Sequence, residues 1–219
     1  MADRVQIELS KIGKRYKRWI FRDIDLIFQP AGTYGITGHN GIGKSTLLRV
    51  ISGYTSPTSG LVKYSHATKG VLDAQTAATS IAFAAPYIDL IDELTVLEMI
   101  NFHCSFKNVF PDLKDHETIL KSIDLTSHGD VMVADLSSGL MQRLKVGLMI
   151  ITDTPVLLLD EPTSYLDLQG KRWYHALIQK YQQDRLIIVA SNDLEDVAMT
   201  KTQIDMGEFV WNREEINVA

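Results

Sequence analysis

Cysteine is almost absent from this sequence, because Cys104 is the only one among 219 residues. A single cysteine cannot form a disulfide within the chain, so we expect a reducing compartment. Long apolar runs are missing as well, and no stretch reaches the length of about 18 residues that a membrane-spanning helix needs. The start of the chain carries no pattern typical of a signal peptide. We therefore expect a chain that does not cross a membrane by itself.

A surplus of positive charge is also lacking, since the formal net charge is -5. Proteins that bind nucleic acids in general need a basic face, so we expect no nucleic-acid partner. Hydrophobic residues make up 45% and charged residues 22%, which is ordinary for a globular protein. The length fits one large α/β domain with room for a small inserted subdomain.

Strand and helix patterns alternate along the chain. Because parallel strands are joined by helices, this alternation predicts right-handed βαβ units and a doubly wound sheet. Leu97, Ile100 and Phe102 form one expected apolar stripe in a mostly helical segment over residues 95–125. We expect strands at residues 5–9, 24–28, 33–37, 61–64, 70–72, 81–84, 156–159 and 186–190, and further helices at 45–52, 140–151 and 173–181.

A phosphate-binding loop is the strongest motif. Residues 38–45 read Gly-His-Asn-Gly-Ile-Gly-Lys-Ser and match the pattern G-x-x-x-x-G-K-[ST] between an expected strand and an expected helix. Glycines let the loop curl so that backbone N–H groups and the helix N-terminus point at an anion. Lys44 can reach the β and γ phosphates, and the Ser45 hydroxyl can bind Mg²⁺. The expected nucleotide-binding residues here are Gly38, His39, Asn40, Gly41, Ile42, Gly43, Lys44, Ser45 and Thr46.

Two carboxylates follow the apolar run at residues 156–159. Ligands bind at the carboxyl ends of the strands of a parallel sheet, which is where Asp160 and Glu161 are expected. Asp160 is suited to hold Mg²⁺, and Glu161 is suited to act as the base on the attacking water. An acidic turn after a strand is common by itself, but the phosphate loop favours the catalytic interpretation.

With these motifs in this order, the sequence resembles an ABC-family nucleotide-binding domain along nearly its whole length. Residues 136–140, Leu-Ser-Ser-Gly-Leu, resemble the family signature, and residues 164–167, Ser-Tyr-Leu-Asp, resemble the D-loop. Tyr16 resembles the aromatic residue that stacks on adenine, although Trp19 is a rival for that role.

The resemblance implies one domain over residues 1–219 with a P-loop NTPase core and a mixed or parallel sheet. An antiparallel β subdomain is expected near the N-terminus and a helical insert at approximately residues 87–150. Two such domains, identical copies or paralogues, would enclose two ATP molecules. Ser137, Ser138 and Gly139 of one domain would then contact the ATP held by the other.

The sequence departs from the family pattern at three places. Ser138 and Leu140 replace the usual glycine and glutamine of the signature. Pro86 stands where the Q-loop glutamine is expected and has no side-chain ligand for Mg²⁺, so Asp89 or a water would have to fill its place. Asn192 stands where the switch histidine is expected and cannot change its charge near neutral pH. We expect slow but real ATP hydrolysis.

Two further features are better explained without a function. The basic run at residues 14–18 is more typical of a solvated face near the triphosphate than of a lipid or nucleic-acid patch. The histidines show no metal-ligand spacing, and the adjacent His103 and Cys104 would face different directions on a helix.

The leading hypothesis is the ATP-hydrolysing motor of an ABC transporter, on the cytoplasmic face of the membrane, with permease subunits as separate chains. The segment near residues 86–94 would pass the motion to them. The alternatives are a soluble ABC ATPase without a transport role and a nucleotide-gated module that hydrolyses ATP weakly or not at all. The transported substrate and its direction of movement are not encoded in any motif that we identify.

Overall fold

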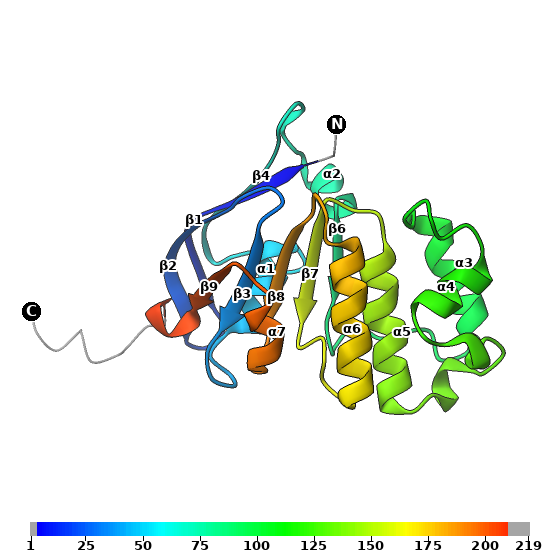
Figure 1. The fold of residues 1–219 in the computed structure, drawn as a ribbon. Coiled ribbons are helices and arrows are strands. Elements are labelled where there is room, and N and C mark those ends of the chain that lie inside the picture. The colour runs from blue at the N-terminus through cyan, green and yellow to red at the C-terminus, as the bar shows by residue number, and fades with distance from the viewer. Residues whose placement is uncertain (1–3, 210–219) are drawn as a thin grey trace, which may run out of the picture.

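The strands of the computed structural model, which describes residues 4–209, form two sheets (Figure 1). One sheet is antiparallel, with the strand order β2-β1-β4-β5, and the other is parallel, with the order β6-β7-β8-β3-β9. The strands are β1 (Val5–Arg15), β2 (Trp19–Phe28), β3 (Thr33–Thr37), β4 (Ser59–His66), β5 (Gly70–Val71), β6 (Ile81–Ala84), β7 (Val156–Asp160), β8 (Leu186–Ala190) and β9 (Thr202–Asp205).

The parallel sheet is covered on both faces, and every residue of β7 and β8 is buried. Leu157 and Leu159 pack against the helices on one face. Val156 and Leu158 point to the other face, where the core includes helix α1 (Lys44–Ile51) and the antiparallel sheet. Since both faces are covered, these strands need apolar residues at every position, and this is why they appear as continuous apolar runs.

The helices divide into two groups (Figure 1). Helices α5 (Ser138–Ile151) and α6 (Leu168–Tyr181) lie beside the parallel sheet, and α3 (Val96–Phe106) and α4 (His116–Ser122) lie further from the antiparallel sheet. None of the helices in the described part of the chain has the length and hydropathy of a membrane span. The remaining helical elements are α2 (Ala74–Thr79), α7 (Leu194–Ala198) and 3-10 turns at Thr126–His128, Val133–Asp135 and Met206–Phe209.

The predicted fold class is confirmed, with a parallel core, an antiparallel β sheet near the N-terminus and helices between β6 and β7. Strands 33–37, 81–84 and 186–190 have the predicted bounds. Helices α3 and α4 lie in the segment expected to form a helical insert at approximately residues 87–150, and α5 ends one residue beyond it. The ends of the predicted domain, residues 1 and 219, lie outside the described residues.

The segment over residues 95–125 is less helical than the sequence predicts. Helix α3 ends at Phe106, because the backbone at Lys107 is extended with φ -130° and ψ 136°, and α4 begins at His116, where Asp115 caps it. Pro111 lies between them and cannot donate a backbone hydrogen bond to continue a helix. Phe102 is 45% exposed and not part of the buried stripe, so that prediction was wrong. Two residues beyond Ile100, the helix has turned by about 200°, which directs Phe102 to the opposite face.

Helices α2 and α7 and strand β9 are absent from the sequence-based expectations. They have 6, 5 and 4 residues, which is too short for a hydrophobic period to stand out. Two of them nevertheless matter for the site, because α7 follows β8 directly and β9 pairs with β3, the strand that leads into the phosphate loop.

Candidate functional site

The loop between β3 and α1 adopts a conformation that depends on glycine. Gly43, which precedes the first residue of α1, has a φ of 121°, in a region that side chains with a Cβ rarely occupy. A Cβ at this position would also lie 2.7 Å from Ile20 Cγ2. The loop can therefore curl around the N-terminus of α1, where free backbone N–H groups and the helix dipole favour an anion.

Lys44 places its ammonium group at the centre of this loop. The side chain is only 4% exposed, and Nζ donates hydrogen bonds to the carbonyl oxygen of Gly38 at 2.8 Å and to Asn192 Oδ1 at 2.7 Å. Glu161 Oε1 lies 3.9 Å from the same nitrogen. A buried ammonium needs such partners, since an unpaired charge in the interior would be strongly destabilising.

Ser45 and Asp160 lie together at the carboxyl end of β7. The Ser45 hydroxyl donates a hydrogen bond to Asp160 Oδ1 at 3.0 Å. The other carboxylate oxygen, Oδ2, is buried without a hydrogen-bond partner, and burial raises the pKa of Asp160 to about 6.

This pair fits a magnesium ion. Mg²⁺ prefers oxygen ligands, and it is usually held by one or two carboxylates together with phosphates and water. The free oxygen of Asp160 and the Ser45 hydroxyl supply such ligands. Among the described residues no group of three or more His, Cys, Asp or Glu side chains could hold a metal ion by itself, so phosphates and water would have to complete the shell.

Glu161 is held from the end of the neighbouring strand. Its backbone N–H donates to the carbonyl oxygen of Ala190 at 2.7 Å, and Oε2 lies 3.3 Å from both the Ser191 hydroxyl and the Asn192 backbone nitrogen. The residue has a φ of 47°, in the left-handed region, which costs about 1–3 kcal/mol for a residue with a side chain. These contacts fix the carboxylate beside Lys44.

Asn192 connects the two charged side chains. Its Oδ1 accepts from Lys44, and its Nδ2 donates to Glu161 Oε1 at 2.9 Å. The same amide nitrogen also donates to Asn40 Oδ1 in the phosphate loop. The side chain that replaces the expected switch histidine thus joins the loop, the lysine and the carboxylate in one hydrogen-bonded network.

A buried aspartate behind this network is absent from the sequence-based expectations. Asp196 Oδ2 accepts from the Ser191 hydroxyl at 2.8 Å and from the Thr163 hydroxyl at 2.9 Å. Burial raises the pKa of this carboxyl, and His175 Nε2 lies 3.8 Å from its other oxygen. Asp196 lies on the short helix α7, so no periodic pattern marks it in the sequence.

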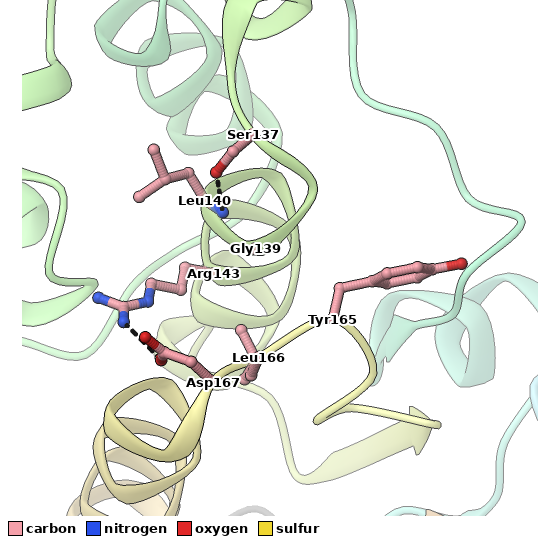
Figure 2. A pocket seen from close by; sticks show the side chains of 7 residues that line it. All are labelled: Ser137, Gly139, Leu140, Arg143, Tyr165, Leu166 and Asp167. Carbon is pink, nitrogen blue, oxygen red and sulfur yellow. Dashed lines mark hydrogen bonds and ion pairs between the residues drawn. The ribbon is translucent and has the colours of Figure 1, made fainter.

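Ser137 and Gly139 lie in another part of the molecule, at the N-terminus of α5. Ser137 caps this helix by accepting a hydrogen bond from the Leu140 backbone nitrogen at 3.4 Å (Figure 2). A cavity of about 300 Å³ lies here, and none of the phosphate-loop residues lines it. In Figure 2 the Arg143 and Asp167 side chains point toward each other, and the Tyr165 ring points away from them. The lining residues are Ser137, Gly139, Leu140, Arg143, Tyr165, Leu166 and Asp167.

Gln142 links α5 to the turn that follows β7. Its Nε2 donates to the carbonyl oxygen of Pro162 at 3.0 Å, directly after Glu161. This hydrogen bond ties α5 to the turn that contains Glu161 and Pro162.

The two candidates for stacking on adenine differ in how free their rings are. Tyr16 is 57% exposed, with Lys14 Nζ 5.0 Å from its ring centroid. The Trp19 ring already has guanidinium groups nearby, from Arg15 at 5.3 Å and Arg22 at 4.7 Å. This geometry favours Tyr16.

Pro86 lies just after β6 and is exposed, so it contributes no polar side chain to the site. Its carbonyl oxygen accepts a hydrogen bond from Lys145 Nζ at 3.2 Å. Asp89 is also exposed, and its charge acts on Lys145, where it opposes the lowering of the lysine pKa by burial.

Comparison with known proteins gives a consistent result. The family model described as "ABC transporter" matches residues 21–164, more than half of the chain. The human ATP-binding cassette sub-family A member 10 is 32% identical over 164 residues, which is 74% of this chain and 11% of that protein. The mouse phospholipid-transporting ATPase ABCA3 is 28% identical over 199 residues, or 90% of this chain and 12% of that protein. The chain thus spans about a tenth of the length of these relatives.

The fold is also found among solved structures. One is the ATP-binding cassette MJ0796 in a dimeric post-hydrolysis state bound to ADP and Pi, with a TM-score of 0.77 and 22% identity. The match covers 91% of this chain and 93% of that chain. At this level of identity the likeness supports the fold alone.

Proposed function

This chain belongs to the ABC transporter family and is an ATPase domain of that type, and we propose that it is the motor of a membrane transporter. Closure of a domain dimer on ATP would drive transport by separate membrane subunits. The observation that carries this proposal is the convergence of Lys44, Ser45, Asp160 and Glu161 at the carboxyl ends of β3 and β7, around the N-terminus of α1.

In the proposed mechanism, residues 38–46 bind the phosphates of ATP. The backbone N–H groups of the loop would surround the β-phosphate, and the γ-phosphate would replace Asn192 as a partner of the Lys44 ammonium. Tyr16 would stack on the adenine from the turn between β1 and β2. Thr46, on the first turn of α1, would add its backbone N–H to the α-phosphate side.

Ser45 and Asp160 would hold Mg²⁺, which when bound neutralises charge on the phosphate oxygens. The free Asp160 Oδ2 and its neighbour, the Ser45 hydroxyl, support this assignment. The positive charge would also keep Asp160 ionised in spite of its burial.

Glu161 would accept a proton from the water that attacks the γ-phosphate. For this, one carboxylate oxygen has to turn from Asn192 or Ser191 toward the water. Asn192 would then donate its amide N–H to the γ-phosphate, so that the same side chain serves the resting and the ATP-bound state.

A second domain would complete the site. Ser137, Ser138 and Gly139 lie at the N-terminus of a 14-residue helix, where backbone N–H groups are suited to the phosphate held by the partner. This partner is either a copy of the chain or a paralogue. Residues 87–150 would form the helical subdomain of a single domain over residues 1–219, and residues 86–94 would contact the membrane subunits at the cytoplasmic face.

The measurement that tests this function is Mg-ATP turnover by the purified chain beside a Glu161→Gln variant. We expect slow turnover in the wild type and a loss of at least about 100-fold in the variant, because the amide cannot accept the proton. ATP binding should remain in both proteins. Equal turnover in the two proteins would exclude Glu161 as the base.

A nucleotide-gated module without turnover is the second candidate. It is favoured by Asn192, which engages both Lys44 and Glu161 in the structure, and by the absence of a polar side chain at Pro86. Tight ATP binding without turnover in the wild type, also in the presence of the membrane subunits, would support this candidate.

A further inference from the structure

Of the polar side-chain atoms that are buried without a hydrogen-bond partner in the described part of the chain, three lie on α1 and at the ends of β6 and β7. They are Arg49 Nε on α1, the Tyr87 hydroxyl after β6 and Asp160 Oδ2 at the end of β7. Leaving such atoms unpaired costs about 1–3 kcal/mol each, so a cluster of them in a folded protein calls for an explanation. Unlike Asp160, the other two have no role in the function proposed above.

Two of these residues are in contact, and the third ends the strand beside β6. The Arg49 guanidinium carbon lies 3.6 Å from the centroid of the Tyr87 ring. Strands β6 and β7 are paired, with Ala84 opposite Leu159, so the segments that follow them start side by side. Asp160 is also close enough for its charge to act on the pKa values of both Tyr87 and Arg49.

Three side chains lie next to the Tyr87 ring. Arg49 stacks on it, the Phe83 ring packs against it at 6.2 Å with an edge-on geometry, and the Tyr54 ring lies 6.4 Å away. A ring that is fixed in this way keeps its hydroxyl in one place, which is what a polar contact to a bound ligand requires.

Position 87 directly follows Pro86, where the family pattern expects a glutamine. Pro86 is exposed, whereas the Tyr87 hydroxyl is buried. The side chain that is directed into the protein is therefore that of Tyr87 and not that of Pro86. A tyrosine hydroxyl can donate one hydrogen bond and accept others, as a carboxamide can.

We infer that Tyr87 supplies the missing polar contact at the magnesium side of the ATP site, where its hydroxyl would hydrogen-bond to a water of the magnesium shell beside Asp160. Arg49 is a positioning residue for the ring. The inference rests on the function proposed above. It assigns to Tyr87 the polar contact that Pro86 cannot make.

The protonation state of Tyr87 agrees with this role. Burial raises the pKa of Tyr87 to about 12, and the Arg49 guanidinium, which lies close to the hydroxyl although the two do not form a well-aligned hydrogen bond, opposes that shift. The hydroxyl is therefore neutral at physiological pH and can donate its proton to an oxygen.

The test is a Mg²⁺ titration of nucleotide binding by the full chain, with the non-hydrolysable β,γ-imido analogue of ATP as the probe. Tyr87→Phe keeps the ring over Arg49 and removes only the hydroxyl. We expect the Mg²⁺ concentration for half-maximal binding to rise about fivefold, as for the loss of one hydrogen bond, while the affinity measured in EDTA stays the same.

Tyr54→Phe is the matched control, because it removes the same group from a ring that is 70% exposed and lies next to Tyr87. We expect it to titrate as the wild type.

A wild-type titration curve for Tyr87→Phe, or equal shifts in Tyr87→Phe and Tyr54→Phe, would overturn the inference. If Tyr87→Phe is misfolded by circular dichroism, Tyr87→Gln and Tyr87→Leu replace it. Tyr87→Gln should then bind Mg²⁺ more tightly than Tyr87→Leu, and equal Mg²⁺ affinities of the two variants would contradict the role of Tyr87. A wild-type chain that does not bind the analogue at any Mg²⁺ concentration would instead refute the proposed function itself.

Discussion

Asn192 illustrates how much a single residue contributes to this site. Its amide accepts a hydrogen bond from Lys44 and donates to Glu161, so it bridges two oppositely charged groups whose nearest atoms are 3.9 Å apart. An amide can do both because it carries a donor and an acceptor, but it cannot exchange a proton near neutral pH. We therefore connect Asn192 with the slow hydrolysis that we expect.

Replacing Asn192 with histidine should raise Mg-ATP turnover by about tenfold, because an imidazole can donate a proton to the γ-phosphate and recover it near neutral pH. The measurement is kcat between pH 6 and 8, where a new pH dependence is expected in Asn192→His. Asn192→Gln is the control, since it keeps an amide and should gain nothing. Unchanged turnover in Asn192→His would refute this view of the position.

At the scale of elements, the accuracy of the sequence-based predictions follows burial and length. Strands β7 and β8 are buried on both faces, and their unbroken apolar runs identify them in the sequence. Helix α7 has 5 residues and is fixed by its neighbours, among them the Ser191 and Thr163 hydroxyls that bind Asp196. Its stability comes from tertiary contacts, so its own sequence does not reveal it.

Helices α3 and α5 are joined by a buried pair that should make the protein sensitive to acid. His103 Nε2 and Thr152 Oγ1 lie 2.8 Å apart, and Thr152 donates its own proton to the Leu148 carbonyl oxygen, so the histidine is the donor. Burial lowers the pKa of His103 from 6.5 to about 4. Between these values the unfolded chain binds the extra proton and the folded chain does not, so stability falls as the pH falls.

Replacing His103 with glutamine should remove this dependence, because an amide can donate to Thr152 without titrating. Relative to His103→Gln, we expect the wild type to lose about 3 kcal/mol of unfolding free energy between pH 6.5 and 4. Urea denaturation of both proteins at several pH values measures the difference. Parallel pH profiles for the two proteins would contradict the buried neutral state of His103.

At the scale of the whole molecule, the residues expected to contact ATP fall into two separate groups. Lys44, Asp160 and Glu161 meet at one edge of the parallel sheet, whereas Ser137 and Gly139 line a cavity at the start of α5. Tyr165, beside this cavity, is 72% exposed. A site divided in this way is consistent with the proposal that two domains face each other across two ATP molecules.

This arrangement predicts a charge-dependent dimer. Glu161→Gln should form dimers when ATP is added, as measured by light scattering after gel filtration. Adding Ser137→Asp should prevent them, because aspartate still caps α5 but repels the phosphates of the partner's ATP. Ser137→Thr in the same background is the control and should still dimerise. If the variant with Ser137→Asp still forms dimers and binds ATP as tightly as Glu161→Gln alone, Ser137 does not contact the partner's ATP.

The sequence by itself determined the chemistry and the fold class, because the groups that carry them are contiguous: the loop at residues 38–45 and the apolar run that ends in Asp160 and Glu161 each lie within a few residues. Only the tertiary structure decided which partners these groups have. Asn192 binds Lys44 although the two are 148 residues apart in the chain, and Tyr87, which follows β6, contacts Arg49 on α1. Such contacts depend on how the strands are ordered in the sheet, and that order is set by packing of the whole chain.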